Sequence, residues 1–358
     1  MKILHIAPIG HHSEGIGEVL QKLSPLQKSL GNDVKVVSIF ENKIYENFHI
    51  ITLNKKKEFL EFISKWLPDI VIFHSHYHFE YVIFSGILKR YQIPYCVQLH
   101  GALSKSNYKK NHILKAVAGC LILNRILKGA VSIIYLNKKE YENSIVPTIN
   151  PNFSIIPNGC DGNKYYNNNH VVNTPVKIVY IGRISIEHKG LDILLDAIDI
   201  IQKENCNKFH IFFYGNPSDD GVPELKRRLE KCSIASYEGG VYGKDKEKLL
   251  KEADVFILTS RYEGMPMGVL EAWSYGIPCI LTEGTNMIDD NMDSKAYWKA
   301  ELCSNNIAST IISSVNLYIN NPSLYRNAAL LESKKYDWNH ISEQSISLYE
   351  SMIKDYTF

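Results

Sequence analysis

The sequence predicts an α/β protein with two domains, each built on a doubly wound parallel sheet. Short apolar runs alternate with segments of helical periodicity along the whole chain, which is typical of parallel β-α-β units. The chain has 358 residues, which is long for one sheet of this kind and enough for two. Its hydrophobic share of 45% is ordinary for a globular protein.

The apolar runs mark the expected strands. In the first half they are Lys2–Ala7, Asp33–Ile39, Ile50–Leu53, Asp69–Phe73, Tyr95–Leu99, Val131–Tyr135 and Phe153–Ile156. In the second half they are Lys177–Ile181, Phe209–Tyr214, Ser236–Glu238, Asp254–Leu258 and Pro278–Leu281. The polar stretch 165–175 is the expected linker, and 336–354 is expected to form a long helix.

The pair Glu263 and Glu271 is the most informative feature of the chain. An apolar run over 253–260 precedes the pair, and a helical run over 269–275 follows. The Gly- and Pro-containing loop between these runs places a helix N-terminus at the carboxyl edge of a sheet, where open α/β folds bind ligands. Backbone N–H groups there suit a phosphate, and a carboxylate on either side can hold hydroxyl groups. This layout fits a nucleotide joined to a sugar.

Arg183 and Lys189 flank a second strand-to-helix junction. An apolar run over 176–181 comes before them, and a helix with Leu191, Leu194, Leu195 and Ile198 at helical spacing follows. Arg183 offers a planar fork and Lys189 a point charge, a combination suited to a diphosphate. Either cation alone is more often a solvated surface residue. The prediction therefore depends on finding both strand-to-helix junctions, that of Arg183 and Lys189 first and that of Glu263 and Glu271 second.

With these motifs the chain resembles the retaining family-4 glycosyltransferases of the GT-B fold, of the bacterial surface-polysaccharide type. Gly182-Arg183 with Lys189-Gly190 is similar to their diphosphate clamp, and Glu263 to Glu271 is similar to their E-x7-E element. The resemblance implies two Rossmann-like domains facing across a cleft, over 1–168 for the acceptor and 169–336 for the nucleotide sugar. It also implies a C-terminal helix, 337–358, that packs back on the first domain.

The resemblance assigns the donor site residue by residue. It implies that Glu263 contacts hydroxyls of the transferred sugar, that Glu271 contacts the ribose, and that the base stacks near 237–242. The expected donor-binding residues are Gly15, Gly17, Gly182, Arg183, Lys189, Glu263, Gly264, Met265, Pro266, Met267, Gly268, Val269 and Glu271. After Gly284 the chain departs from the family's Gly-Gly-x-x-Glu pattern, which leaves the identity of the sugar open.

His100 follows an expected strand and resembles the family's active-site histidine, which contacts the donor sugar. With Arg183, Lys189 and Glu263 it forms the expected catalytic set. The Gly-rich segment 10–17 resembles the loop that reaches toward the donor phosphate. A capping role for His100 and an ordinary βα turn at 10–17 are the alternatives.

No metal is expected. His74, His76 and His78 alternate along the chain and could share one face of a strand, as in a zinc site. The resemblance instead places such histidines along the edge of the cleft. The sequence contains no Asp-x-Asp, so we expect no divalent cation at the phosphates. In the family the leaving phosphate itself helps to deprotonate the acceptor, and the anomeric configuration is retained.

The charge is unevenly distributed. Residues 1–170 hold 20 Lys and Arg against 12 Asp and Glu, a net charge of +8, whereas the whole chain carries +2. From 81 to 139 there is no Asp or Glu, and 107–127 mixes cations with apolar residues, which indicates a basic amphipathic helix on an anionic membrane. A solvated basic face is the alternative, and no motif supports nucleic-acid binding. The residues expected at the acceptor or membrane surface are Lys105, Lys109, Lys110, Lys115 and Arg125.

Cysteine usage and apolar runs bear on the compartment. Seven cysteines without a Cys-x-x-Cys pair indicate reduced core residues of a cytosolic protein. The apolar run 116–123 is too short to span a bilayer, and 1–7 reads as a strand rather than a signal peptide. We therefore expect a cytoplasmic protein that lies peripherally on the inner face of the cell membrane.

The sequence thus predicts a retaining, metal-independent glycosyltransferase of the hexosyltransferase type, without cofactors. We expect transfer of one sugar from a nucleotide-sugar donor, a UDP-sugar rather than GDP-mannose, to a lipid-linked oligosaccharide in O-antigen or capsule synthesis. The alternatives are a glycosyltransferase for a soluble small-molecule acceptor and a catalytically silent nucleotide-binding scaffold. The element Glu263 to Glu271 argues against a nucleotide-sugar 2-epimerase.

Overall fold

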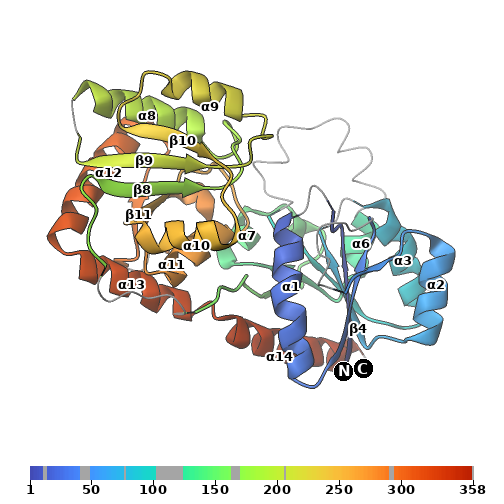
Figure 1. The fold of residues 1–358 in the computed structure, drawn as a ribbon. Coiled ribbons are helices and arrows are strands. Elements are labelled where there is room, and N and C mark those ends of the chain that lie inside the picture. Colours follow the sequence, from blue (N-terminus) through green and yellow to red (C-terminus); the bar gives the residue numbers. More distant parts are fainter. Residues whose placement is uncertain are drawn as a thin grey trace. The chain divides into compact units, whose positions relative to one another are not determined.

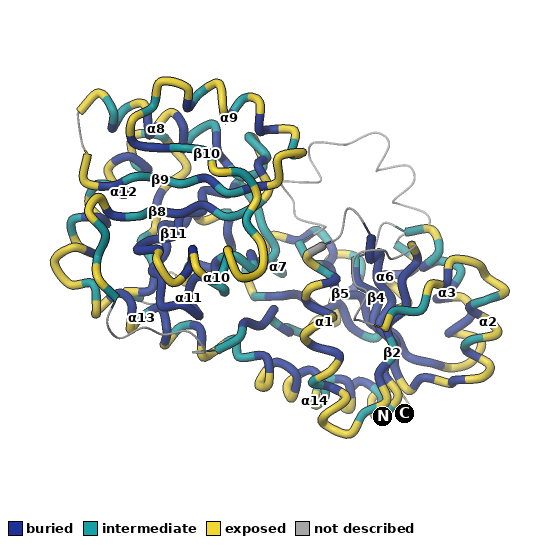
Figure 2. The backbone as a smooth tube through the Cα atoms, viewed as in Figure 1, coloured by how far each residue is buried: buried dark blue, intermediate teal, exposed yellow. Residues whose placement is uncertain are grey.

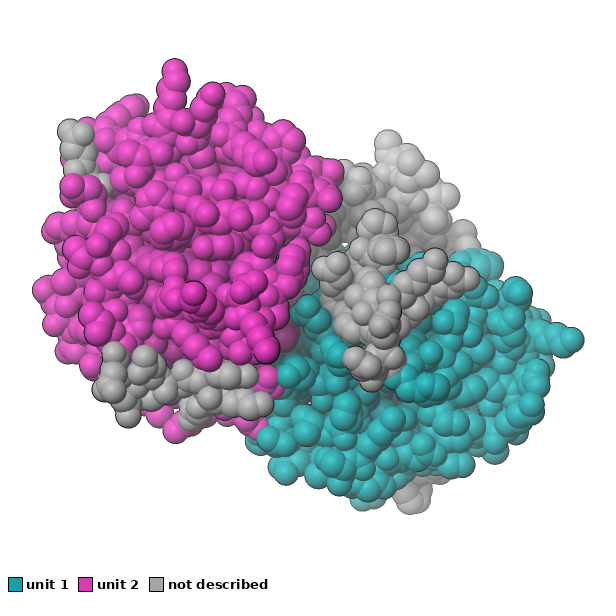
Figure 3. Space-filling view, viewed as in Figure 1, with its two compact units in different colours: residues 1–159, 338–358 teal, residues 160–337 magenta. Residues whose placement is uncertain are grey.

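The chain folds into two compact units. The computed structural model describes residues 1–10, 14–40, 49–75, 78–101, 124–162, 170–204, 207–289 and 294–356. The first unit holds Met1–Gly159 and Trp338–Phe358, and the second holds Cys160–Asp337 (Figure 3). The chain therefore passes to the second unit at 159/160, before the expected boundary at 168/169, and its C-terminal segment returns to the first unit.

The first unit is built on a parallel sheet, as predicted. Its described strands are β1 (Lys2–Ala7), β2 (Asp33–Ser38), β3 (Ile51–Thr52), β4 (Ile70–His74), β5 (Tyr95–Gln98), β6 (Ser132–Tyr135) and β7 (Phe153–Ile155). Their order in the sheet is β3-β2-β1-β4-β5-β6-β7, and every pairing is parallel. This is the doubly wound arrangement, with a change of direction between β1 and β4.

Helices cover both faces of this sheet (Figure 1). One group is α2 (Lys56–Lys65), α3 (Phe79–Arg90) and α6 (Asn124–Gly129), and the other is α1 (Glu14–Ser29) and α14 (Trp338–Tyr356). Short helices α7 (Lys138–Asn143) and η2 (Val146–Thr148) follow β6. Since successive residues of a strand point to opposite faces, Leu4 and Ile6 join the core with α2 and α3, while His5 points toward α1.

The second unit is built on another doubly wound parallel sheet, again as predicted. Its strands are β8 (Val176–Ile181), β9 (Phe209–Tyr214), β10 (Ala235–Gly239), β11 (Val255–Leu258), β12 (Cys279–Thr282) and β13 (Tyr297–Ala300), in the order β10-β9-β8-β11-β12-β13. The sequence interpretation missed β13, because this edge strand is only half-buried along most of its length and lacks an apolar run. Figure 2 shows the strands of both sheets as mostly buried and the outer turns of the helices as exposed.

The helices of the second unit also lie on both faces of its sheet (Figure 1). They are α8 (Leu191–Lys203), α9 (Val222–Leu229), α10 (Gly243–Glu252), α11 (Met267–Ser274), η3 (Glu283–Thr285), α12 (Ser304–Asn320) and α13 (Pro322–Lys334). α8 packs on α12, and α11 packs on α13. The apolar residues predicted at helical spacing in α8 are buried.

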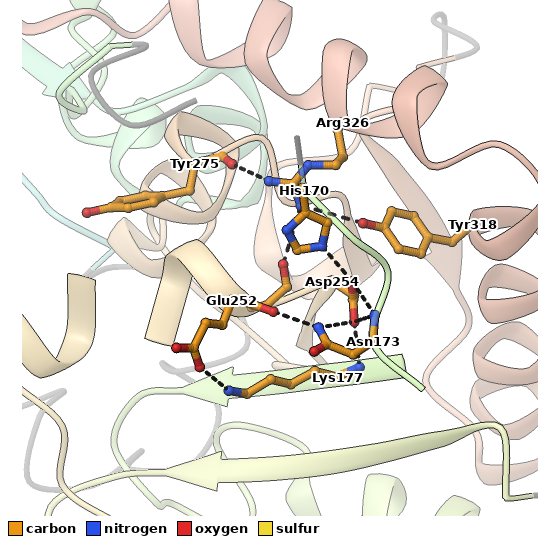
Figure 4. A network of polar contacts seen from close by, with 9 residues as sticks. His170, Asn173, Lys177, Glu252, Asp254, Tyr275, Tyr318 and Arg326 are labelled. Atoms are coloured by element: carbon orange, nitrogen blue, oxygen red, sulfur yellow. Dashed lines mark hydrogen bonds and ion pairs between the residues drawn. The ribbon is translucent and has the colours of Figure 1, made fainter. Parts of the chain in front are cut away.

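A buried polar network fixes the segment that enters β8 (Figure 4). The carboxylate of Asp254 accepts hydrogen bonds from His170 Nε2 at 2.7 Å, Asn173 Nδ2 at 2.7 Å and the Lys177 N–H at 2.8 Å. The buried guanidinium of Arg326 donates to the carbonyl of Tyr275 at 3.1 Å. This network lies at the amino ends of β8 and β11, so it anchors the second half of the predicted linker to the second unit.

The cysteines fit the sequence prediction only in part. Cys96, Cys160 and Cys279 are buried and free, as expected of reduced core residues. Cys232 is half-buried and Cys303 is exposed, so the core prediction is wrong for these two. Cys232 follows the end of α9 and Cys303 directly precedes α12, and most of their neighbours in the sequence are polar.

Candidate functional site

The predicted donor residues of the second unit cluster where β8 and β11 end. These two strands are neighbours at the point where the sheet changes direction, the position at which open α/β sheets bind ligands. Gly182 and Arg183 directly follow β8, and the loop that ends in Pro266 follows β11. Both loops then lead into helices, α8 and α11.

Two glycines allow these loops to approach closely. Gly190 has a φ of 64°, and a Cβ there would stand 2.1 Å from the carbonyl oxygen of Thr259, so only glycine fits. A Cβ on Gly268 would stand 3.2 Å from the ring of Phe256 and 3.4 Å from the carbonyl oxygen of Ile181. The first contact joins the Lys189 loop to the end of β11, and the second places the start of α11 against the end of β8.

Glu263 and Lys189 form an ion pair at the centre of the cluster. Lys189 Nζ lies 2.6 Å from Glu263 Oε1, and their side chains are 14% and 12% exposed. The hydroxyl of Ser260 donates to the same Oε1 at 2.6 Å. The Nδ2 of Asn286 donates to the main-chain oxygen of Glu263 at 2.6 Å. These contacts fix the carboxylate and leave its Oε2 outside the ion pair.

Arg183 is oriented by a histidine of its own loop. Its Nη2 donates to His188 Nδ1 at 3.0 Å. Because guanidinium is always a donor, His188 carries its proton on Nε2 and donates to the carbonyl of Tyr262 at 2.8 Å. The His188 ring stacks on the Tyr262 ring at 4.3 Å, and burial lowers the His188 pKa. The Arg183 side chain stays exposed and is thereby available to an anion.

Glu271 lies in α11, and its carboxylate is paired with Lys246 of α10 at 2.6 Å. Both side chains are about one-third exposed, at 33% and 30%. Glu271 is therefore held from one side, and this partner was not foreseen from the sequence. A Lys on another helix gives no local signal.

The N-terminus of α11 supplies the backbone groups of the site. The helix begins at Met267 after Pro266, and Met265 is buried while Gly264 is half-buried. The Val269 N–H donates to the Pro266 carbonyl at 3.1 Å, so it is not among the free donors of this helix N-terminus. The N–H groups of Met267 and Gly268 begin the helix, where donors have no intrahelical partner.

In the first unit, the predicted His100 belongs to a row of histidines. His5 of β1 and His74 of β4 lie on the same face of neighbouring strands, and His74 Nδ1 is 2.8 Å from His100 Nε2. His100 has a φ of 52°, a left-handed conformation that is uncommon for a residue with a side chain. Burial lowers the pKa of His100 to about 4. His74 therefore lies between two imidazoles, those of His5 and His100, and contacts both.

Glu140 holds the loop that follows His100. This buried carboxylate, in the first turn of α7, accepts hydrogen bonds from the N–H groups of Gly101 and Leu136. Burial raises the pKa of Glu140 to about 7. Gly15 and Gly17 lie in the first turn of α1, which follows the loop after β1. The sequence interpretation overlooked Glu140, whose spacing from Asn137 is that of a helix capping box.

Of the residues predicted at the acceptor or membrane surface, Arg125 is exposed on α6. Lys105, Lys109, Lys110 and Lys115 lie outside the described residues, as does His76. Within the described part of the chain, no helix has the length and apolarity to cross a membrane. The same residues contain no group of three or more His, Cys, Asp or Glu side chains placed to hold a metal ion.

Residues 175–314 match the family described as Glycosyl transferases group 1. They cover the loops of Arg183 and Lys189 and the segment from Glu263 to Glu271. The second unit contains a glycosyltransferase group 1 domain. The resemblance drawn from the sequence is therefore confirmed at the level of this domain.

The group 1 domain has named relatives. Lipopolysaccharide 1,6-galactosyltransferase of Salmonella typhimurium is 31% identical over 139 residues, which are 34% of this chain and 35% of that protein. Mannosylfructose-phosphate synthase of Agrobacterium fabrum is 25% identical over 145 residues, 36% and 32% of the two chains. These two matches span about a third of the length of the curated relatives. Capsular polysaccharide biosynthesis glycosyltransferase CapH of Staphylococcus aureus is 26% identical over 316 residues, 82% of this chain and 80% of CapH.

Solved structures match the chain over nearly its whole length. HepE of Anabaena, crystallised with UDP-glucose, has a TM-score of 0.76 at 17% identity and covers 98% of this chain and 100% of its own. WaaG, a glycosyltransferase involved in lipopolysaccharide biosynthesis, has a TM-score of 0.71 at 12% identity and covers 98% and 99%. At these identities the likeness concerns the fold alone, and it confirms the predicted GT-B fold class.

Proposed function

We propose that the chain is a retaining glycosyltransferase that moves one hexose from a nucleotide sugar to a lipid-linked oligosaccharide in the synthesis of a cell-surface polysaccharide. The observation that carries this proposal is the fixed pair Lys189–Glu263 beside Arg183 and the N-terminus of α11. The names of relatives in lipopolysaccharide and capsule synthesis support the polysaccharide setting.

The proposed chemistry is cleavage of the bond between the anomeric carbon and the diphosphate. Negative charge grows on the leaving phosphate, and preorganised donors stabilise such charge better than water does. Arg183 and Lys189 supply cations, and the first N–H groups of α11 supply dipoles. Glu263 is proposed to hold sugar hydroxyls through its Oε2, because its Oε1 already accepts from Lys189 and Ser260.

Glu271 is proposed to accept hydrogen bonds from the ribose hydroxyls. Its carboxylate is oriented by Lys246, and it lies one turn along α11 from the phosphate-binding end. The first unit is proposed to contribute His100, Gly15 and Gly17 to donor binding. A UDP-sugar is preferred over GDP-mannose as the donor, in line with the UDP-glucose complex of the structurally similar HepE.

Metal independence and the acceptor are part of the proposal. The sequence has no Asp-x-Asp to bridge a cation to the phosphates, so Arg183 and Lys189 are proposed to neutralise the charge alone. A lipid-linked acceptor and a peripheral membrane location are proposed from the basic first half of the chain. Mannosylfructose-phosphate synthase among the relatives favours, as a second candidate, transfer to a soluble sugar phosphate.

A thermal-shift panel of nucleotide sugars, run with and without EDTA, tests the donor. A ligand that binds only the folded state raises Tm as its concentration exceeds Kd. We expect one UDP-sugar to raise Tm equally with and without EDTA, and the increase to disappear in Glu271→Ala. No increase with any nucleotide would overturn the transferase proposal. Co-sedimentation with anionic vesicles at low and high salt separates a lipid-linked from a soluble acceptor, since membrane attraction weakens with ionic strength.

A further inference from the structure

Three histidines of the first unit form a continuous hydrogen-bonded chain. His5 Nδ1 lies 2.9 Å from His74 Nε2, and His74 Nδ1 lies 2.8 Å from His100 Nε2. His5 and His74 are fully buried. Ile3 and Ile72 occupy neighbouring positions on the same face of β1 and β4, so an apolar side chain fits this layer. Imidazoles at these positions therefore serve a role other than apolar packing, because the buried ring nitrogens must find hydrogen-bond partners.

The inner end of the chain sets the direction of its hydrogen bonds. Ser345 of α14 donates its hydroxyl proton to the carbonyl of Ser342 at 2.7 Å, so its oxygen accepts from Gln27 Nε2 at 3.0 Å. This contact turns Gln27 Oε1 toward His5 Nε2, 2.9 Å away. An amide oxygen only accepts, so His5 carries its proton on Nε2.

This direction propagates to His100. Burial lowers the pKa of His5 and His100 to about 4 and that of His74 well below 6.5, so all three are neutral at pH 7. A neutral imidazole has one donor and one acceptor nitrogen. His5 Nδ1 therefore accepts from His74 Nε2, and His74 Nδ1 accepts from His100 Nε2. His100 is left with an unprotonated Nδ1.

We propose that Gln27, His5 and His74 are positioning residues that hold His100 as the Nε2–H tautomer, so that its Nδ1 accepts a hydrogen bond from the substrate. This inference rests on the proposed function through the assignment of His100 to the donor site. The substrate group that meets Nδ1 must then be a donor such as a hydroxyl. A carboxylate in the same place would face a lone pair, so a uronic acid bearing its carboxylate there is excluded. The proposed substrate class is a neutral sugar that places a hydroxyl group at this nitrogen.

The tautomer is tested directly by NMR of protein labelled with ¹⁵N-histidine at pH 7. We expect the Nε2 of His100 to be protonated and its Nδ1 to be bare, with the resonance assigned from His100→Asn. Gln27→Met removes the acceptor that sets the direction, so His100 should shift toward the Nδ1–H form. Gln21→Met, an exposed position of the same helix, is the matched control and should leave the tautomer unchanged.

A protonated Nδ1 in the wild type, or an unchanged tautomer in Gln27→Met, would overturn the proposal. If Gln27→Met does not fold, Ser345→Ala serves in its place, because it lets the Gln27 amide rotate without removing it. Ser347→Ala, exposed on the same helix, is its control. This readout requires no nucleotide, so it stands or fails independently of the transferase proposal.

Kinetics test the consequence for the substrate. With UDP-glucose and UDP-glucuronate as probes, we expect the wild type to prefer the neutral sugar by on the order of 100-fold in kcat/KM. In Gln27→Met the preference should shrink at least tenfold, while the affinity for UDP alone stays the same. Equal use of both probes by an enzyme with the expected tautomer would overturn the substrate class. Failure of every nucleotide sugar to bind would instead overturn the proposed function.

Discussion

The strands of the two sheets follow the same order around the point where each sheet changes direction, but the polar residues near that point differ in charge. In the first unit, between β1 and β4, the polar groups are buried neutral imidazoles. In the second, between β8 and β11, they are ions: Lys189 and Glu263 at 2.6 Å, with Arg183 nearby in the chain. The ions keep some exposure, 14% and 12%, whereas His5 and His74 keep none.

The difference follows from desolvation. An ion needs water or a counter-charge, so a site for a diphosphate has to remain partly open. A neutral donor and acceptor can be sealed inside the core if each is satisfied. With the proposed roles, the same topology places charged residues for a phosphate where they stay partly exposed, and neutral residues for a hydroxyl where they are buried.

Removing a cation from the charged cluster of the second unit gives the largest expected effect on activity. Lys189→Ala and Arg183→Ala should each lower kcat for sugar transfer by about 10²- to 10³-fold, the usual loss when one preorganised donor to a developing charge is removed. Lys203→Ala, exposed at the end of α8, is the control and should retain full activity. A loss below about threefold in Lys189→Ala, with Tm unchanged, would contradict the assignment.

Lowering the pH should destabilise the fold through the buried, neutral histidines of the first unit. Burial lowers the pKa of His5 from 6.5 to about 4, so between these pH values His5 stays neutral in the folded state and is protonated in the unfolded state. The free energy of unfolding is therefore unaffected above pH 6.5 and falls as the pH drops toward 4, by roughly 3 kcal/mol for His5 alone. Urea titrations at pH 7 and pH 4.5 measure this loss. Because Glu140 titrates in the opposite sense, the decisive comparison is made in Glu140→Gln, where equal midpoints at the two pH values would contradict neutral histidines in the fold.

Over nearly the same pH range, Glu140 should change the free energy of unfolding in the direction opposite to the histidines. Its pKa is raised from 4.5 to about 7 by burial, so the folded state keeps a proton that the unfolded state releases. Its contribution is fully present below pH 4.5 and is lost as the pH rises through 7. Glu140→Gln should therefore make the loss of stability toward acid steeper than in the wild type. The exposed Glu142→Gln is the control, and an identical slope in Glu140→Gln would refute the assignment.

Glu271 should matter for binding rather than for folding. Glu271→Ala removes a charged acceptor and should weaken nucleotide binding by about 10- to 100-fold, while Tm without ligand stays within a few degrees. Lys246→Ala, which removes the partner at 2.6 Å, should weaken binding less. Calorimetric titration with UDP measures both. Glu230→Ala, exposed beyond α9, is the control, and normal affinity in Glu271→Ala would remove this residue from the site.

An exposed ion pair gives the smallest expected effect. Arg227 and Glu224 also lie 2.6 Å apart, but their side chains are 66% and 42% exposed. Arg227→Ala should leave the free energy of unfolding nearly unchanged, since surface pairs are screened by water and salt. Urea denaturation checks this value. A larger loss would mean that distance rather than burial decides the strength of the pairs in this protein.

The sequence was sufficient where the signal is local. The strands before Gly182 and before Ser260 are apolar runs, and the helices after them have a 3.6-residue repeat, so both junctions could be placed from the chain alone. Arg183, Lys189, Glu263 and Glu271 could be named as candidates because they stand at fixed spacing around these junctions. The edge strand β13 was missed because it lacks this local signal.

Only the tertiary structure decided the partners. Ser260 and Lys189 share one carboxylate oxygen, and Lys246 reaches Glu271 from another helix. The histidine chain is the clearest case, because it joins residues 5, 27, 74, 100 and 345. Periodicity shows which face of a strand a side chain takes, but the register of β1 on β4 and the crossing of α1 and α14 decide which side chains meet. Hydrogen-bond direction depends on those meetings, so it is a property of the fold and not of any segment of the sequence.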